Sequence, residues 1–221
     1  MNKFSSAIFD MDGLLIDSEP LWQEAGTETL QHFGVSLTPA QYHSTTGLRT
    51  PEWIDHWFTY FNIDKRSAPE AVDKILALAL EKISAKGEAL PGVQYIMEFF
   101  KEKGFKIGLA SSSPLILINT VIDKLQIRPY LSAINSAEFL HYGKPHPQVF
   151  LDCATQLSVA PTTCICFEDS FNGMIAAKAA RMRCVVIPAP EHHDETRWGA
   201  ADLKLKRLDL FTEEKLALLN A

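Results

Sequence analysis

Residues 7–19 read AIFDMDGLLIDSE, and the first seven letters of this stretch decide the fold. Ala7-Ile8-Phe9 is a short apolar run typical of a buried strand, and it ends in Asp10. Asp12 follows two residues later, directly before Gly13, where the chain must turn sharply. Two carboxylates therefore lie close together at the end of a strand. This arrangement suits a nucleophile and a proton donor that share one metal ion, so the chain is a candidate enzyme.

The composition indicates a globular protein whose partner is a small molecule. The 221 residues suffice for one α/β core and a smaller inserted unit, and 47% of them are hydrophobic. The formal net charge of −6 argues against a nucleic-acid partner. No apolar run approaches the roughly 20 residues that span a bilayer, and we expect neither a membrane anchor nor a secretory leader. The four cysteines match no zinc pattern, and we expect buried thiols in a reducing cytoplasm: Cys153, Cys164, Cys166 and Cys184.

The alternation of predicted strands and helices along the chain predicts a doubly wound parallel sheet. Residues 4–10 form the first predicted strand, and from residue 91 onward helices and strands alternate. Strands joined by helices of this length pair in parallel. The further predicted strands are 106–111, 133–135, 164–168 and 184–187, and the predicted helices start at Val93, at Ser113-Pro114, at Pro147 and at Phe171.

A block without any convincing strand interrupts this series after the first strand. Helical spacing and helix-start signals recur through it, including Pro20 and the sequence Thr50-Pro51-Glu52. We therefore expect an all-helical cap at 17–88 inserted into a core domain made of 1–16 and 89–221. The hinge candidates are Leu14–Ser18 and Lys86–Gly92.

Polar side chains follow each predicted strand, at the edge of the sheet where ligands bind in open α/β folds. Asp10 and Asp12 end the first strand, Ser111 and Ser112 the second, Lys144 follows the third, and Glu168 and Asp169 end the fourth. Oxygen ligands of this kind fit a hard cation such as Mg²⁺. Lys144 adds a positive point charge, and Ser111 can donate a hydrogen bond to a phosphate oxygen. The set predicts phosphoryl transfer through a carboxylate nucleophile, which forms an acyl-phosphate that water then hydrolyses.

Each of these residues also has a plain structural interpretation. Asp10 and Asp12 can form a cap and turn pair, Asp-x-Asp-Gly occurs in calcium loops, and Glu168-Asp169-Ser170 can cap the helix that follows. Ser113-Pro114 fits a helix start. Arg49 is either a ligand of substrate hydroxyls or phosphate, or an exposed charge. Trp22 is either core or a wall facing a sugar, and His192-His193 fits an exposed loop pair without metal.

Four motifs in order give the chain a resemblance to a known family. Asp10-Met11-Asp12-Gly13, Leu109-Ala110-Ser111, Lys144-Pro145 and Glu168-Asp169-Ser170 resemble those of haloacid dehalogenase superfamily phosphatases with a helical cap. The resemblance implies that Asp10 is nucleophile and metal ligand, and that Asp12 is general acid/base with its carbonyl on the metal. It implies a phosphate site of Ser111 and Lys144 with backbone donors around Met11 and Ser112, and a metal site completed by Asp169 with Glu168 beside it.

Further stretches narrow the resemblance to bacterial hexitol and 2-deoxyglucose-6-phosphate phosphatases: Asp17-Ser18-Glu19-Pro20-Leu21-Trp22, Gly47-Leu48-Arg49 and Lys144–Phe150. The related β-phosphoglucomutases carry a histidine in the place of Trp22, which disfavours a phosphomutase. Asp12 disfavours a dehalogenase, since those enzymes lack this second aspartate. The interpretation is a Mg²⁺-dependent, monomeric sugar or sugar-alcohol phosphatase. The alternatives are a phosphomutase and a non-catalytic binding protein on the same scaffold, and the preferred metabolite stays open.

Overall fold

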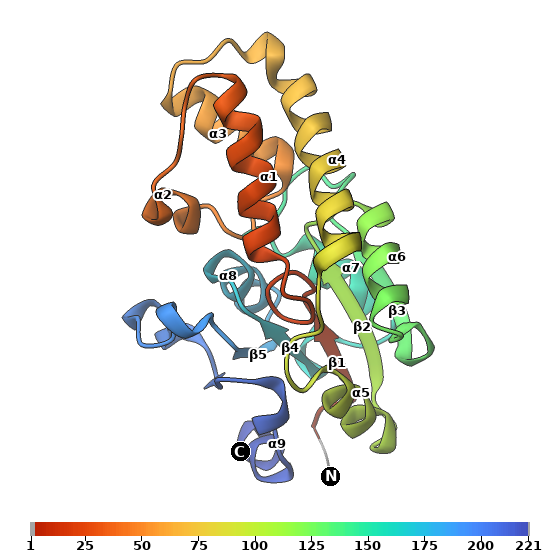
Figure 1. The fold of residues 1–221 in the computed structure, drawn as a ribbon. Helices are drawn as coiled ribbons and strands as arrows, with labels where there is room; N and C mark the ends of the chain where they lie inside the picture. The colour runs from red at the N-terminus through yellow and green to blue at the C-terminus, as the bar shows by residue number, and fades with distance from the viewer. Residues whose placement is uncertain (1–2, 221) are drawn as a thin grey trace.

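The computed structural model describes residues 3–220, so residues 1, 2 and 221 of the predicted core lie outside the described part. Within it the chain forms a six-stranded parallel sheet in the order β3-β2-β1-β4-β5-β6 (Figure 1). The strands are β1 (Ser6–Phe9), β2 (Lys106–Ser111), β3 (Leu131–Ser136), β4 (Cys164–Glu168), β5 (Arg183–Val186) and β6 (Leu203–Lys204). The prediction of a doubly wound α/β sheet with an inserted helical block is confirmed.

The strand order places a topological switch point beside β1. The chain builds outward from β1 through β2 to β3, then returns to pair β4 with the other side of β1. Ligands of such sheets bind outside the carboxyl ends of the strands that flank this point. The short β6 was not predicted, because two residues are too few to show an alternating pattern.

Helices cover both faces of the sheet. Helices α5 (Val93–Glu102), α6 (Leu115–Lys124) and α9 (Glu213–Asn220) share one hydrophobic cluster with Phe9, whereas α7 (Gln148–Gln156) and α8 (Phe171–Ala179) share the other with Ile8. Neighbouring residues of β1 thus point to opposite layers, as the pleat requires. Short 3₁₀ turns complete the described chain at Lys65–Ser67, Arg128–Tyr130, Pro161–Thr163, Pro190–His192, Thr196–Ala200 and Leu208–Leu210.

Aromatic rings fix β1 against β4 directly beneath the ends of the two strands. Phe9 stacks on Phe167 with ring centroids 4.8 Å apart, and Phe100 meets both rings edge-on at 6.0 and 5.6 Å. All three residues are fully buried. Aromatic pairs of this kind add about 0.5–1.5 kcal/mol each beyond the burial of their area. This packing holds Asp10 and Glu168, the next polar residues along each strand, at a fixed separation.

The helical block lies above the carboxyl edge of the sheet (Figure 1). It contains α1 (Glu19–His32), α2 (Pro39–Ser44), α3 (Thr50–Tyr60) and α4 (Ala68–Lys86). Its own core centres on Leu30, Trp57 and Phe58. Thr38 caps α2 through a reciprocal pair of bonds with Gln41, a start signal that the sequence interpretation missed.

The two connections between block and core run side by side. The amide of Asp17 donates to the carbonyl of Glu88 at 2.8 Å, and the amide of Leu90 donates to the carbonyl of Leu15 at 3.0 Å. Ile16 and Ala89 lie opposite each other in an antiparallel bridge between these bonds. The four cysteines are free and buried. None of the helices within residues 3–220 has the length and apolar character needed to cross a membrane.

Candidate active site

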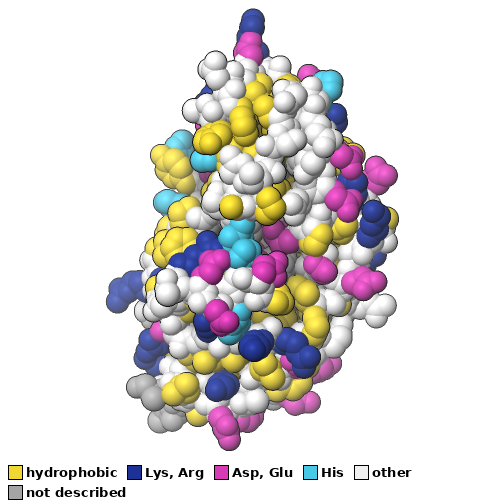
Figure 2. Space-filling model, turned by 60° about the vertical axis from the view of Figure 1, so that its left-hand side comes forward, with side chains coloured by type: hydrophobic (Ala, Val, Ile, Leu, Met, Phe, Trp, Pro, Cys, Tyr) yellow, Lys and Arg dark blue, Asp and Glu magenta, His cyan; other side chains and the backbone are white. Residues whose placement is uncertain are grey.

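A pocket lies between the carboxyl edge of the sheet and the helical block. Figure 2 shows this junction as a hollow between the upper and lower parts of the molecule, with acidic side chains visible in it. Core and block both supply its lining, which consists of Asp10, Asp12, Glu19, Trp22, Gly26, Tyr42, Thr45, Thr46, Gly47, Leu48, Thr50, Trp53, Ile75, Ser111, Ser112, Ser113, Lys144, Asp169 and Ser170. The four strand ends singled out in the sequence therefore meet at one place.

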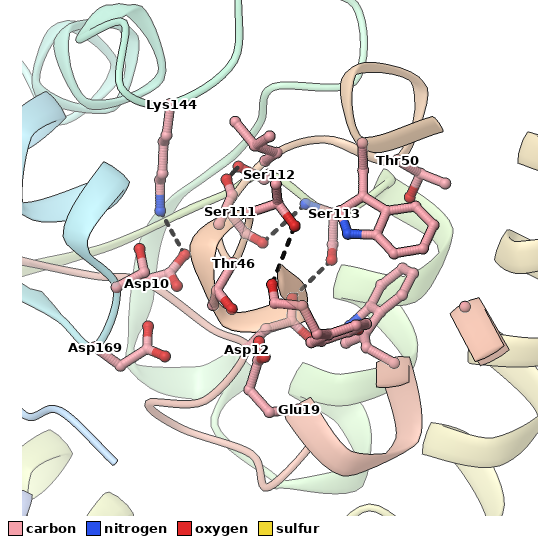
Figure 3. A pocket seen from close by; sticks show the side chains of 18 of the residues that line it. Asp10, Asp12, Glu19, Thr46, Thr50, Ser111, Ser112, Ser113, Lys144 and Asp169 are labelled. Carbon is pink, nitrogen blue, oxygen red and sulfur yellow. Dashed lines mark hydrogen bonds and ion pairs between the residues drawn. The ribbon is translucent and has the colours of Figure 1, made fainter. Parts of the chain in front are cut away.

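Lys144 lies between two carboxylates at the floor of the pocket, and Figure 3 shows its contact with one of them, Asp10. Its Nζ is 2.6 Å from Asp10 Oδ1 and 2.6 Å from Glu168 Oε1, and it also donates to the carbonyl of Ala110 at 3.2 Å. The residue is only 2% exposed. Burial alone would lower the pKa of Lys144, but the two carboxylates outweigh burial and raise it above its usual value. Lys144 is therefore a fixed ammonium ion beside Asp10.

Three acids gather around this cation. Asp10, Glu168 and Asp169 bring carboxylate oxygens within 4.8 Å of one another. Burial raises the pKa of Asp10 to about 7, with Lys144 opposing the rise and Glu168 adding to it. Burial also raises the pKa of Asp169 well above its usual value, with Glu168 and Asp10 adding to the effect. The cluster therefore carries more potential negative charge than Lys144 can neutralise.

Asp169 fits a divalent cation. Its Oδ1 is buried and has no hydrogen-bond partner among the described residues. A buried carboxylate oxygen left without a donor is costly unless a cation meets it. The space beside it is kept by Gly13, where an added Cβ would lie 2.2 Å from Asp169 Oδ2. The carboxylate oxygens of Asp10 and Asp169 are of the kind that Mg²⁺ prefers as ligands.

Glu168 lies behind the pocket wall. It is fully buried, and its Oε2 accepts from the amides of Asp169 and Ser170 and from Ser170 Oγ, each at 3.1 Å. Its carboxylate leaves no room for a side chain at Gly173, because an added Cβ would meet Oε1 at 1.8 Å. Glu168 thus holds Lys144 and the turn that presents Asp169. Ser170 also caps α8 through Gly173, as the sequence indicated.

Asp12 is held by three donors that converge on its carboxylate. Ser18 Oγ and Trp22 Nε1 donate to Oδ1 at 2.7 and 2.9 Å, and Ser113 Oγ donates to Oδ2 at 2.7 Å. The expected capping role of Ser113 is wrong, because α6 starts at Leu115 without a side-chain cap. The Trp22 ring lines the pocket, and its N–H donates to Asp12, a contact that the sequence does not predict. These bonds fix the orientation of the Asp12 carboxylate at the pocket.

The serines after β2 and the backbone after Asp10 shape the rest of the floor. Ser111 is 1% exposed, and its Oγ accepts from the amide of Ser113 at 3.0 Å, which leaves the hydroxyl proton free to be donated. Ser112 Oγ donates to the carbonyl of Gly47 at 2.9 Å and so links the core to the helical block. The Met11 side chain is buried in the core, and its carbonyl accepts from the amide of Leu15 at 2.8 Å.

Arg49 is not among the pocket-lining residues. Its Nη1 donates to the carbonyls of Ala137 and Leu140 at 3.1 and 2.5 Å, and its Nη2 donates to the carbonyl of His141 at 3.2 Å. Glu52 completes the set with a 2.6 Å ion pair. In this conformation Arg49 contacts neither the acids nor the serines of the site.

Several pocket residues from the helical block were not predicted. They are Glu19, Tyr42, Thr46, Thr50 and Trp53. Burial raises the pKa of Glu19 to about 8, and the nearby Asp12, Asp10 and Asp17 add to the effect. Glu19 stands in a stretch that the sequence marks only by its resemblance. The others lie on helix faces whose direction depends on how the block docks, which spacing alone does not reveal.

A second group of possible ligands lies at the rim, away from the acids. His192 is partly buried rather than exposed, and it stacks on His43 of α2 with ring centroids 3.4 Å apart. With Glu195 they bring three ligand atoms within 4.8 Å of one another. The guanidinium of Arg197 contacts both His43 Nε2 and Glu195, so a positive charge already occupies the place that a metal ion would need.

Comparisons with known proteins identify the family of the chain. The haloacid dehalogenase-like hydrolase family matches residues 7–187. Hexitol phosphatase B of Escherichia coli (strain K12) is 44% identical over 212 residues, which cover 96% of both chains. A fructose-1-phosphate phosphatase of the same strain is 30% identical over 188 residues, covering 83% of this chain and 96% of that one. The crystal structure of β-phosphoglucomutase from Clostridium difficile superposes with a TM-score of 0.85 at 25% identity, covering 97% and 96% of the two chains. The chain therefore belongs to the haloacid dehalogenase-like hydrolase family, and it is a phosphatase.

Proposed function

We propose that this phosphatase hydrolyses phosphate monoesters of sugars or sugar alcohols through an aspartyl-phosphate formed on Asp10, with Mg²⁺ as cofactor. The observation that carries the proposal is the buried ion triad of Asp10, Lys144 and Glu168, which opens onto a pocket shared with Asp169. A fixed cation beside a carboxylate is what an anionic phosphoryl group needs in order to approach a nucleophile of the same sign. The hexitol and fructose-1-phosphate phosphatases among the relatives support the substrate class.

The residues at the floor of the pocket have separate roles in the first step of the reaction. Asp10 Oδ1 is fixed by Lys144 and its other oxygen attacks phosphorus in line, which forms the acyl-phosphate and releases an alkoxide. Lys144 and the Ser111 hydroxyl stabilise the phosphoryl oxygens. Asp10, Asp169 and the backbone carbonyl of Asp12 would hold Mg²⁺, with Glu168 beside them. The bound ion supplies positive charge that neutralises the phosphate.

Asp12 carries the proton between the two halves of the reaction. It protonates the leaving alkoxide and later removes a proton from the water that hydrolyses the acyl-phosphate. Its carboxylate is oriented by Ser18, Trp22 and Ser113, so only its backbone carbonyl is left for a metal ion. The two aspartates therefore perform different tasks in one small space.

The wall supplied by the helical block suits a polyhydroxylated leaving group. Trp22, Tyr42 and Trp53 offer aromatic faces, and Glu19 and Thr46 offer acceptors and a donor for hydroxyl groups. We propose that residues 17–88 act as a cap that closes over the substrate and excludes bulk water. The buried free thiols suit a reducing cytoplasm, and we propose a monomeric cytoplasmic enzyme.

A panel of phosphorylated metabolites tests the substrate class. We expect sorbitol 6-phosphate and 2-deoxyglucose 6-phosphate to give a higher kcat/KM than phosphoglycolate, because the small acid leaves the hydroxyl-binding wall unused. Phosphate release is the measurement. A clear preference for phosphoglycolate would contradict the proposed class. Conversion of a hexose 1-phosphate into a 6-phosphate, rather than into free phosphate, would instead identify a phosphomutase.

Removal of metal is expected to stop phosphate release from p-nitrophenyl phosphate and to lower the Tm of the protein. The folded metal-free protein holds Asp10 at a pKa of about 7, against an ordinary value of 3.8. The raised pKa of Asp10 therefore lowers the free energy of unfolding by its full amount above about pH 7, and this destabilisation disappears as the pH falls toward 4. Adding Mg²⁺ should raise Tm more at pH 8 than at pH 5.5. Equal activity in EDTA and in Mg²⁺ would contradict the assigned cofactor.

Trp22→Phe is expected to lower kcat by about tenfold, since it removes one of the three bonds that orient the general acid/base. Phenylalanine keeps a smaller aromatic ring at this position, so KM should change less than kcat. Trp57→Phe is the matched control, because it also removes an indole N–H, bonded here to Thr45 Oγ1 at 3.3 Å, without touching Asp12. Steady-state kinetics give kcat and KM of both variants for the comparison. Equal kcat for the two would show that Trp22 does not act through Asp12.

A further inference from the structure

The start of α3 is fastened to the core loop that leads to Lys144. Arg49 donates to three carbonyls of the 137–143 loop, those of Ala137, Leu140 and His141. Glu52, one turn along α3, accepts from the amide of Gly143 at 2.9 Å through Oε1. The same oxygen accepts from Arg49 Nη2 at 2.6 Å. One ion pair of the cap thus binds the loop along almost its whole length.

Burial and charge make this contact specific. The Arg49 side chain is 11% exposed and that of Glu52 is 29% exposed. Burial alone would raise the pKa of Glu52, but hydrogen bonds from Arg49 and from the Gly143 amide outweigh burial and lower it. Charge-assisted bonds of a planar guanidinium to several carbonyls fix direction as well as distance. The pair is therefore a directional contact rather than a loose surface ion pair.

Gly143 gives an independent indication that the contact is tight. A Cβ added there would lie 2.5 Å from Glu52 Oε2 and 2.8 Å from Arg49 Nε. Any other residue at this position would push the ion pair away from the loop. Gly143 directly precedes Lys144, so the point of closest approach adjoins the cation of the active site.

The loop packs only partly on the core. Phe139 is 87% exposed and Tyr142 is 56% exposed, whereas Leu140 packs against the hydrophobic cluster beneath α7 and α8. Its start is anchored by Ser136 Oγ, which donates to the carbonyl of Ser113 at 2.6 Å. The amide of Ala137 also donates to the carbonyl of Ser111 at 2.9 Å, and Glu138 accepts from the amide of Leu115 at 3.0 Å. Closer to Lys144, the polar contact with Arg49 and Glu52 holds the backbone of residues 140–143.

We propose that Arg49 and Glu52 are positioning residues: through the 137–143 loop they set Lys144 against Asp10 when the cap docks, and Arg49 does not bind substrate. The inference rests on the proposed function, in which Lys144 stabilises the transferring phosphoryl group. It couples cap closure to assembly of the phosphate site. Before the cap docks, the loop lacks the contacts with Arg49 and Glu52, and the ammonium is held only by its core acceptors Asp10, Glu168 and the Ala110 carbonyl.

The test compares Arg49→Ala, Gly143→Ala and the double variant on two substrates, p-nitrophenyl phosphate and sorbitol 6-phosphate. If both residues act through the loop, each single variant lowers kcat by about tenfold to a hundredfold on both substrates, since small misplacements of catalytic groups have effects of this size. KM should change little. The kcat of the double variant should be no lower than that of the slower single variant, because both changes break the same contact between the cap and the 137–143 loop.

Arg66→Ala is the matched control for loss of a cap arginine, because Arg66 is 91% exposed and pairs only locally with Asp64 in the described structure. It should retain wild-type kcat. Glu52→Gln keeps an acceptor for the Gly143 amide but loses the ion pair, so we expect a smaller fall in kcat with the same pattern. If the alanine variants do not fold, the kcat of Glu52→Gln tests the proposal in their place.

Other outcomes overturn the inference. A rise in KM for sorbitol 6-phosphate alone, with p-nitrophenyl phosphate unaffected and Gly143→Ala like wild type, would make Arg49 a substrate ligand. Additive losses in the double variant would show that the two positions act separately. Failure of the wild-type protein to hydrolyse either ester in Mg²⁺ would instead reject the proposed function, so the two failures are distinguishable.

Discussion

Asp10→Asn is expected to abolish phosphate release while the protein stays folded. The amide has nearly the same shape as the carboxylate but is not a nucleophile, so kcat should fall by about 10⁴-fold or more. Lys144 keeps its 2.6 Å bond to Glu168, which preserves one ion pair of the triad. Removing one of the clustered carboxylates also relieves repulsion, so the Tm of the metal-free variant should equal or exceed that of wild type.

Steady-state turnover and a thermal melt measure both halves of this expectation. Asp73→Asn, at an exposed position of α4, removes the same charge outside the pocket and should leave kcat unchanged. A variant at position 10 that keeps near wild-type turnover would move the nucleophile to another residue. A large fall in Tm would show instead that Asp10 is needed for the fold.

Lys144→Met should damage both stability and turnover. The substitution keeps most of the side chain's bulk but leaves Asp10 and Glu168, 7% and 0% exposed, without their cation. Removing one partner of a buried ion pair typically costs about 3–5 kcal/mol. The raised pKa of Asp10 sets the sign of the pH dependence. The loss in free energy of unfolding relative to wild type should be largest above pH 7. It should become smaller as the pH falls, because the Asp10 carboxylate becomes protonated.

Urea unfolding at pH 8 and pH 5.5 measures this change in the free energy of unfolding. Lys86→Met is the control, because Lys86 is 61% exposed and its pairing with Glu24 is at the surface. Exposed pairs of this kind contribute about 0–1 kcal/mol. If Lys144→Met unfolds at the same urea concentration as wild type at pH 8, the triad does not stabilise the fold as its burial indicates.

The sheet and the floor of the pocket could be predicted from the sequence because both follow from local pattern. Each strand that matters is an apolar run followed by a polar residue, and parallel pairing brings those ends to one edge. The pattern therefore brings Asp10 and Lys144, 134 residues apart in the sequence, to one edge of the sheet.

The wall and the supports of the site could not be predicted, because they depend on how the helical block docks. Ser113 has the sequence signature of a helix start, yet its hydroxyl reaches Asp12 across 101 residues. The sequence leaves Arg49 open between a substrate ligand and an exposed charge, yet in the folded chain it binds Glu52 and the carbonyls of a loop about 90 residues away. Helical spacing shows which residues share a face, but not what that face meets.

The paired connections at Ile16 and Ala89 bear on the proposed movement of the helical block. Two separate single-chain tethers would allow the upper lobe to swing or twist in several directions. Since these two are hydrogen-bonded to each other on both sides of the bridge, they bend together as one ribbon. If the helical block opens as proposed, the ribbon is the hinge, and a hinge of two joined strands would guide the aromatic wall back to the same place above the acids.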